Sequence, residues 1–209
     1  MSAESEVKAV VFDVGGVLQI GAKIFSKKGI QETLAKKFHL NVDDYLDSID
    51  TNYAKSMEGL ISKGELLKSL SKNLKFTEKK VEKIYFDVYK KKTKINSGAV
   101  RIAKRLKKKG LKVAILSDQW HLSKSPLIPK KFYKTFNSII ISCEVKVRKP
   151  NPKIYKIFLK KIKLKPEEVL FIDNRSWNLV PAKKIGIKTI LFLNNKLLKK
   201  QLKEFLIRI

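Results

Sequence analysis

The sequence predicts an α/β fold, in which a doubly wound parallel sheet forms the core and a helical insertion follows the first strand. Short apolar runs of strand length recur along the chain, and segments with helical spacing separate the later ones. This alternation favours a parallel sheet that helices cover on both faces. Between residues 28 and 92 the strand signal is absent and apolar residues follow helical spacing, which predicts an insertion made of helices.

The first predicted strand covers residues 7–12, Val-Lys-Ala-Val-Val-Phe, and it ends at Asp13. Gly15 and Gly16 follow almost at once, so we expect the chain to turn sharply there. The first strand therefore delivers a carboxylate directly to the edge of the sheet.

The elements after the first strand follow in order. Within the insertion, Asn41 and Thr77 stand where N-caps would start two helices. The later predicted strands cover residues 112–116, 139–141, 169–172 and 189–193. The predicted helices between and after them cover residues 99–106, 153–162, 180–185 and 196–207. Asn151 and Pro152 match an N-cap and a first-turn proline for the second of these helices.

Charge is the most unusual feature of the composition. The 209 residues include 47 Lys and Arg against 19 Asp and Glu, a formal net charge of +28. A hydrophobic fraction of 44% excludes a disordered polycation. Lysine supplies most of the cations, whereas base readout and bidentate phosphate contacts favour arginine. Lysines solvated on helix faces therefore account for most of the charge, and an anionic partner, nucleic acid or acidic protein, stays an alternative.

Other features of the sequence indicate the cellular compartment in which we expect the protein. No run of 18 apolar residues indicates a transmembrane helix, and the start of the chain shows no secretory signal. The single cysteine, Cys143, excludes an internal disulfide framework and a metal site with several cysteines. We therefore expect a cytoplasmic protein without a membrane partner. The oligomeric state is not predicted.

Polar residues follow the predicted strands at the points where they end. They are Asp13, Ser117 with Asp118, and Asp173 with Asn174. Ligands bind at the carboxyl ends of such strands, so we expect these residues to share one site. A carboxylate at Asp13 can attack an electrophile, Asp173 can bind a hard cation, and Lys149 supplies a positive charge.

Four segments resemble the motifs of the haloacid dehalogenase-like hydrolase superfamily. They are VVFDVGGVL (10–18), VAILSDQW (113–120), VRKPNPKIY (147–155) and VLFIDNRSWNLVPAKKIGIKTILF (169–192). The first is similar to the DxGGV motif of a subgroup with small helical caps. The resemblance implies a Rossmann-like core made of residues 1–18 and 97–209, and a helical cap made of residues 19–96.

The resemblance also implies roles for the residues at the strand ends. Asp13 would be the nucleophile that forms an aspartyl-phosphate, and Lys149 would neutralise charge on the phosphoryl group. Ser117, Asp118 and Lys149 would line the substrate site. Mg²⁺ would be held by Asp13, Gly15, Asp173 and Asn174. Attack of a carboxylate on a phosphate dianion is electrostatically opposed, which is why a metal ion and a lysine are needed beside it.

Two positions depart from the phosphatase pattern. Gly15 stands where phosphatases usually carry an Asp that acts as general acid and then as base, and Asn174 replaces a second carboxylate. We expect a Mg²⁺-dependent phosphatase acting on a small phosphorylated metabolite. One alternative is a catalytically weak or inactive relative that binds an anionic partner. Another is a hydrolase whose Asp nucleophile attacks carbon, as in dehalogenases.

Overall fold

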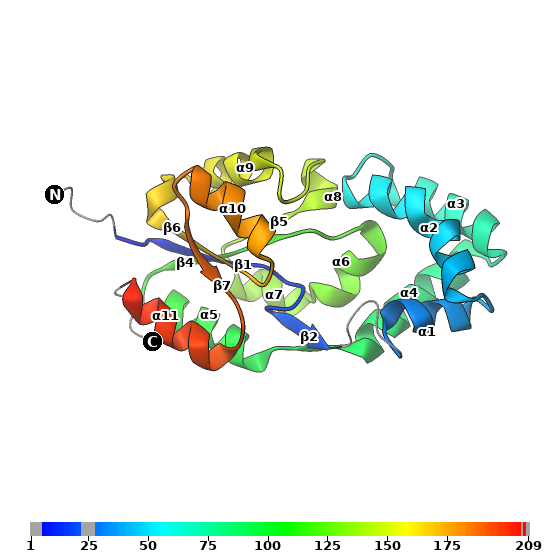
Figure 1. The fold of residues 1–209 in the computed structure, drawn as a ribbon, viewed down its shortest axis with the longest axis horizontal. Helices are drawn as coiled ribbons and strands as arrows, with labels where there is room; N and C mark the ends of the chain where they lie inside the picture. The colour runs from blue at the N-terminus through cyan, green and yellow to red at the C-terminus, as the bar shows by residue number, and fades with distance from the viewer. Residues whose placement is uncertain (1–5, 22–27, 206, 208–209) are drawn as a thin grey trace.

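The computed structural model describes residues 6–21, 28–205 and 207, and Figure 1 shows its fold. Residues 22–27 of the predicted cap lie outside the described residues. A parallel sheet with strand order β5-β4-β1-β6-β7 forms the centre of the core. Its strands are β1 (Ala9–Phe12), β4 (Lys112–Ser117), β5 (Ser138–Ile141), β6 (Val169–Asp173) and β7 (Lys188–Leu191). The predicted strands are thus confirmed, with ends that differ by one or two residues.

Helices cover both faces of this sheet (Figure 1). One layer contains α5 (Ser97–Lys108) and α11 (Asn195–Glu204), and the other contains α9 (Pro152–Ile162) and α10 (Ser176–Lys184). Alternate residues of β1 enter different hydrophobic clusters: Val10 joins the α5 side, whereas Val11 joins the α9 side. This alternation is the period of two expected for a strand that is buried on both faces.

A group of four helices, which we call the cap, lies at one end of the core. It consists of α1 (Ile30–Lys37), α2 (Val42–Met57), α3 (Lys63–Leu74) and α4 (Glu78–Lys92). The side chains of Asn41 and Thr77 accept hydrogen bonds from the third residues of α2 and α4, as the sequence predicts. Two short antiparallel strands, β2 (Gln19–Gly21) and β3 (Thr93–Ile95), pair where the chain enters and leaves the cap.

Several elements differ from the sequence prediction. The strands β2 and β3 are three residues long, which is too short to show a period of two. Prolines interrupt the helical pattern around α6 (His121–Leu127) and α7 (Lys130–Thr135), so neither helix was expected. The short helix α8 (Ser142–Val145) and the 3₁₀ turn at Pro166–Glu168 were also not predicted. The helix α10 begins earlier than predicted, because the residues of its first turn lack apolar spacing.

Aromatic side chains join the cap to the core. Trp120, three residues beyond the end of β4, is 1% exposed and packs edge-on against Tyr53 of α2 and Tyr85 of α4, with ring centroids 5.1 and 5.0 Å apart. Its indole N–H donates to the hydroxyl of Tyr89 at 3.1 Å. The Tyr45 and Tyr85 hydroxyls lie 2.8 Å apart. We call these five residues the aromatic cluster, and it fixes the cap on the strand-end loop of β4.

In the described part of the chain, no helix is long and apolar enough to cross a membrane.

Candidate active site

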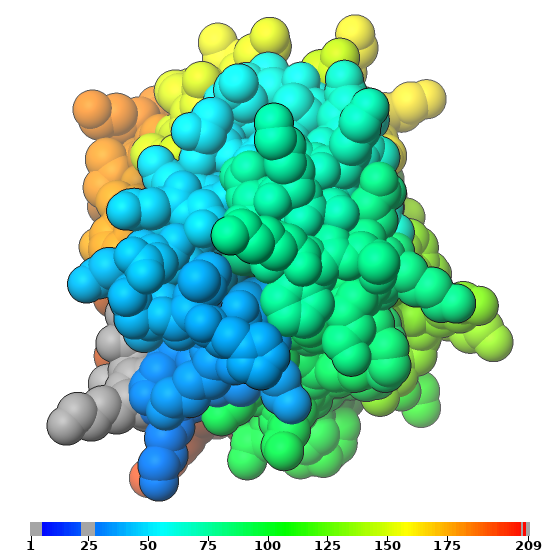
Figure 2. Space-filling model, turned by 90° about the vertical axis from the view of Figure 1, so that its right-hand side faces the viewer, coloured from blue at the N-terminus to red at the C-terminus, as the bar shows by residue number. Residues whose placement is uncertain are grey.

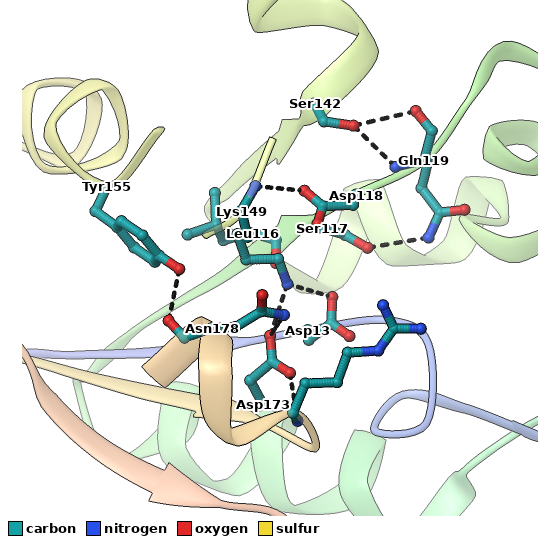
Figure 3. Close-up of polar contacts among 11 residues, drawn as sticks. Asp13, Leu116, Ser117, Asp118, Gln119, Ser142, Lys149, Tyr155, Asp173 and Asn178 are labelled. Carbon is teal, nitrogen blue, oxygen red and sulfur yellow. Dashed lines mark hydrogen bonds and ion pairs between the residues drawn. The ribbon is translucent and has the colours of Figure 1, made fainter. Parts of the chain in front are cut away.

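The parallel register brings the strand-end residues to one edge of the sheet. Phe12 pairs with Ile115 of β4 on one side and with Ile172 of β6 on the other. The residues that follow, Asp13 and Asp173 among them, therefore leave the sheet at the same level. Figure 3 shows Asp13, Ser117 and Asp173 at this edge, together with the side chain of Lys149.

Lys149 is the centre of the site. Its Nζ donates to Asp13 Oδ1 at 2.8 Å, to Asp173 Oδ2 at 2.7 Å and to the carbonyl oxygen of Leu116 at 3.3 Å (Figure 3). The side chains of Lys149 and Asp173 are 1% and 0% exposed, and that of Asp13 is 10% exposed. Two buried carboxylates thus face a single ammonium, and only Asp13 retains access to solvent.

This environment changes the acid–base properties of the group. Burial raises the pKa of the Asp13 carboxyl to about 6, against the opposing effect of the Lys149 ammonium and with the support of Asp173. Burial alone would lower the pKa of Lys149, but Asp13, Asp173 and Asp118 together raise it above its usual value. Lys149 is therefore a fixed positive charge, whereas the Asp13 carboxyl, with a pKa of about 6, can take up a proton.

Further hydrogen bonds fix the carboxylate of Asp173. Its Oδ1 accepts from the backbone N–H of Arg175 at 2.8 Å, and its Oδ2 also accepts from Asn178 Nδ2 at 2.9 Å. Asn178 is held in turn, because its backbone carbonyl oxygen accepts a hydrogen bond from the hydroxyl of Tyr155 on α9 at 2.6 Å. These contacts orient Asp173 toward Lys149 and Asp13, and they make Asn178 and Tyr155 supporting residues.

A second chain of hydrogen bonds reaches Ser117, which is fully buried at the end of β4. Gln119 Nε2 donates to Ser117 Oγ at 3.0 Å, and Gln119 Oε1 accepts from Ser123 Oγ at 2.6 Å. The backbone N–H of Gln119 donates to Ser142 Oγ at 3.0 Å. Because the oxygen of Ser117 accepts from Gln119, its proton can be donated to an oxyanion in the site.

Asp118 contacts the backbone of the segment that carries Lys149. Its Oδ1 accepts from the backbone N–H of Lys149 at 3.0 Å, and burial raises the pKa of its carboxyl despite the nearby Lys149 charge. This bond ties the loop of β4 to the segment that carries the lysine. The structure therefore gives Asp118 a positioning contact beside the site.

The turn after Asp13 requires glycine at only one of its two glycine positions. Gly16 has a φ of +84°, and a Cβ there would lie 2.3 Å from the amide nitrogen of Asn174. Asn174, which is exposed, thus packs on the backbone of Gly16. A Cβ at Gly15 would meet no heavy atom within 4 Å. The space that the side chain of the usual phosphatase Asp would begin to fill at this position is therefore open.

The residues present fit a Mg²⁺ ion by their chemistry. Asp13 and Asp173 bring two carboxylates to the same edge of the sheet, where both contact Lys149, and hard cations prefer such oxygen ligands. Among the described residues, however, no group of three or more His, Cys, Asp and Glu side chains could hold a metal. An ion in this site would thus depend on backbone, amide and water oxygens in addition to the two carboxylates.

Sequence reasoning missed the supporting residues Gln119, Ser142 and Tyr155. Gln119 lies two residues after Ser117 and carries a polar side chain next to a strand end, which was an available signal. Ser142 and Tyr155 lie on other elements, and only the fold brings them to the site.

Comparison with known proteins gives a family match. Residues 7–186 match the family model of the haloacid dehalogenase-like hydrolases. Over 201 residues, 88% of this chain, the sequence is 30% identical to bifunctional epoxide hydrolase 2 of Sus scrofa and covers 36% of that protein. It is 33% identical over 105 residues to glyceraldehyde 3-phosphate phosphatase of Pyrococcus furiosus, covering 47% of this chain and 42% of that one. The matched segments thus cover less than half the length of these two curated relatives.

A solved structure shares the fold. A HAD family enzyme from Bacteroides thetaiotaomicron, crystallised in complex with magnesium and inorganic phosphate, superposes with a TM-score of 0.71 at 20% sequence identity. The match covers 88% of this chain and 93% of that one.

Proposed function

Because the chain belongs to the haloacid dehalogenase-like hydrolase family, we propose that this hydrolase is a Mg²⁺-dependent phosphatase that acts on a small phosphorylated metabolite. The observation that carries the proposal is the buried ammonium of Lys149 between Asp13 and Asp173. This arrangement provides a nucleophile, a fixed positive charge and a second carboxylate in one site.

The proposed reaction has two steps. An oxygen of Asp13 attacks the phosphorus, the bond from phosphorus to the leaving-group oxygen breaks, an aspartyl-phosphate forms, and the leaving oxygen takes a proton from water. A water molecule then attacks the phosphorus and gives one proton to solvent, which releases inorganic phosphate and restores the Asp13 carboxylate. Lys149 neutralises charge on the nucleophile and the phosphoryl group, and the Ser117 hydroxyl donates a hydrogen bond to a phosphoryl oxygen.

Bound Mg²⁺ would neutralise phosphate charge near Asp13, held by Asp13, Asp173, the Gly15 carbonyl and Asn174. We further propose that residues 19–96 form the cap domain that shapes the substrate pocket. A small cap fits a small substrate.

Phosphate release tests the proposal. The substrates are p-nitrophenyl phosphate, sugar phosphates and nucleotides, with Mg²⁺ and with a chelator, and the control is Asp13→Asn. We expect Mg²⁺-dependent turnover that the control lacks. Turnover no higher than that of the control would contradict the proposal, and hydrolysis of a haloacid that survives the chelator would favour dehalogenase chemistry.

A second candidate function is favoured by the open space at Gly15 and by Asn174 in place of a second carboxylate. It is a catalytically weak protein of this fold that binds nucleic acid or an acidic protein through its excess of lysine. Retention on immobilised heparin or DNA with a steep salt dependence, together with absent turnover, would support it.

A further inference from the structure

A groove lies between α1 and α4 of the cap. The helices meet on the face of the cap that points away from the core, where Figure 2 shows blue α1 beside green α4. The cavity has a volume of about 810 Å³, within the range of pockets that hold small molecules. None of the described residues that line it belongs to the site of Asp13, Lys149 and Asp173. We call this cavity the cap groove.

The two helices run antiparallel along the groove. His39, just after α1, stacks on Phe76, just before α4, with ring centroids 6.1 Å apart and planes at 14°. At the other end, Lys92 Nζ donates to the carbonyl oxygen of Lys28 at 2.9 Å. The groove is therefore a trough with an aromatic wall at one end and a lysine contact at the other.

The groove combines an apolar floor with a cationic rim. Ile84 and Val88 of α4 are buried in its floor, and Phe76 forms part of the wall. Among the described residues of the lining, lysines outnumber acids by six to two: Lys28, Lys36, Lys37, Lys80, Lys83 and Lys92 against Glu32 and Asp87. The methylene stems of these lysines extend the apolar surface while their ammonium groups stay in water.

The charge on the rim is not evenly neutralised. Lys36 pairs with Glu32, and Lys83 pairs with Asp87, each at 2.7 Å on its own helix. Lys37 and Lys80 are exposed and lie at the end closed by His39 and Phe76. This end therefore holds a positive charge beside an apolar floor.

We infer that the cap groove binds an amphiphilic organic anion, with its apolar chain on Phe76, Ile84 and Val88 and its anionic head between Lys37 and Lys80. A simple inorganic anion would gain nothing from the apolar floor. A nucleic-acid backbone would favour an open cationic surface with arginine, and the described residues that line the groove include no arginine. The inference is independent of the phosphatase proposal, because the groove and the strand-end site share no residue.

Titration calorimetry with dodecanoate tests the inference, because a carboxylate cannot be hydrolysed by a phosphatase. We expect saturable binding of one dodecanoate, binding at least about tenfold weaker for hexanoate, and no saturable binding of dodecanol or inorganic phosphate. Asp13→Asn should bind dodecanoate like the wild type, which places the ligand outside the strand-end site. Vesicles containing anionic phospholipid, added as competitors, show whether a lipid in a bilayer serves as well as a free amphiphile.

A charge-reversal pair locates the site. Lys37→Glu with Lys80→Glu should weaken dodecanoate binding about tenfold or more. Lys160→Glu with Lys200→Glu, exposed positions on α9 and α11, changes the net charge equally and should leave binding unchanged. Equal affinities of the two double variants would overturn the inference. So would equal affinity for dodecanol, or displacement of dodecanoate by oligo-dT or polyglutamate at lower concentration, which would indicate a macromolecular partner.

Discussion

Two buried polar networks lie at opposite ends of the segment Ser117–Trp120, and they are built on different principles. The strand-end site is ionic: Lys149 holds Asp13 and Asp173 at 2.8 and 2.7 Å. The aromatic cluster is neutral, and its hydroxyl and indole groups bond to one another. Buried charges cost desolvation free energy that their mutual attraction repays incompletely, whereas buried neutral pairs cost far less.

The difference separates reactivity from stability in this molecule. At the ionic site, burial raises the pKa of Asp13 to about 6, and the carboxylate keeps some exposure to solvent. In the aromatic cluster, burial raises the pKa of Tyr85 and Tyr89 above the usual value, so both stay neutral. We therefore expect substitutions in the ionic site to change activity most, and substitutions in the aromatic cluster to change stability most.

The largest expected effect is the loss of activity in Asp13→Asn. The substitution removes the proposed nucleophile, so kcat for p-nitrophenyl phosphate should fall by at least about 10³-fold. Lys149 keeps Asp173 as its partner, so the midpoint of urea unfolding should move much less than in Trp120→Ala. If Asp13→Asn lost much stability but no activity, the expectation that the ionic site controls activity and the aromatic cluster controls stability would be wrong.

Trp120→Ala should have the largest effect on stability. It removes a fully buried indole between α2, α4 and the core, and it should lower the free energy of unfolding by about 3–5 kcal/mol. Circular dichroism during urea unfolding measures the change. Trp177→Ala is the matched control, because Trp177 is 58% exposed, and its effect should stay within about 0.5 kcal/mol.

Gly15→Asp should raise activity at the ionic site. The space around Gly15 is open, and an Asp there can protonate the leaving group and then activate water, which is typically worth about 10²-fold or more. The gain should be larger for alkyl phosphates than for p-nitrophenyl phosphate, whose leaving group needs no proton. Gly15→Ala fills the same space without an acid, and an equal gain from Ala would refute the explanation.

The smallest expected effect concerns the hydroxyl pair of Tyr45 and Tyr85. Either Tyr45→Phe or Tyr85→Phe leaves one buried hydroxyl without its partner and should cost about 1–3 kcal/mol of unfolding free energy. The double variant should cost less than the sum of the single ones, because neither hydroxyl then remains. Strict additivity in urea unfolding would show that the pair is not coupled.

The sequence predicted the sheet and the strand-end residues well, because both depend on local patterns. Asp13 and Asp173 each follow an apolar run, and parallel register alone brings such ends together. Lys149 was identified through its motif, and one lysine among so many carried no signal of its own. Its role as a bridge between two carboxylates depends on the fold.

The parts that could not be predicted depend on contacts between distant elements. The aromatic cluster joins residues from α2, α4 and the loop after β4, and their helical spacing is the same as that of ordinary core residues. Likewise, the lysines of the cap groove are indistinguishable in the sequence from the solvated lysines elsewhere. Only the antiparallel placement of α1 and α4 collects them around apolar residues.

The pairing of β2 with β3 has a mechanical consequence. The two segments that connect core and cap run side by side. Asn96, just after β3, holds the segment that leaves the cap, because its side chain and backbone N–H groups donate to the carbonyl oxygens of Val17 and Leu18 at 2.9 Å. The segment that enters the cap is held by the side chain of Gln19, which donates to the carbonyl oxygen of Leu127 at 2.9 Å. The chain thus passes between core and cap through one two-stranded connection, and the contacts of Trp120, His121 and Arg148 with the cap hold it against the core away from that connection.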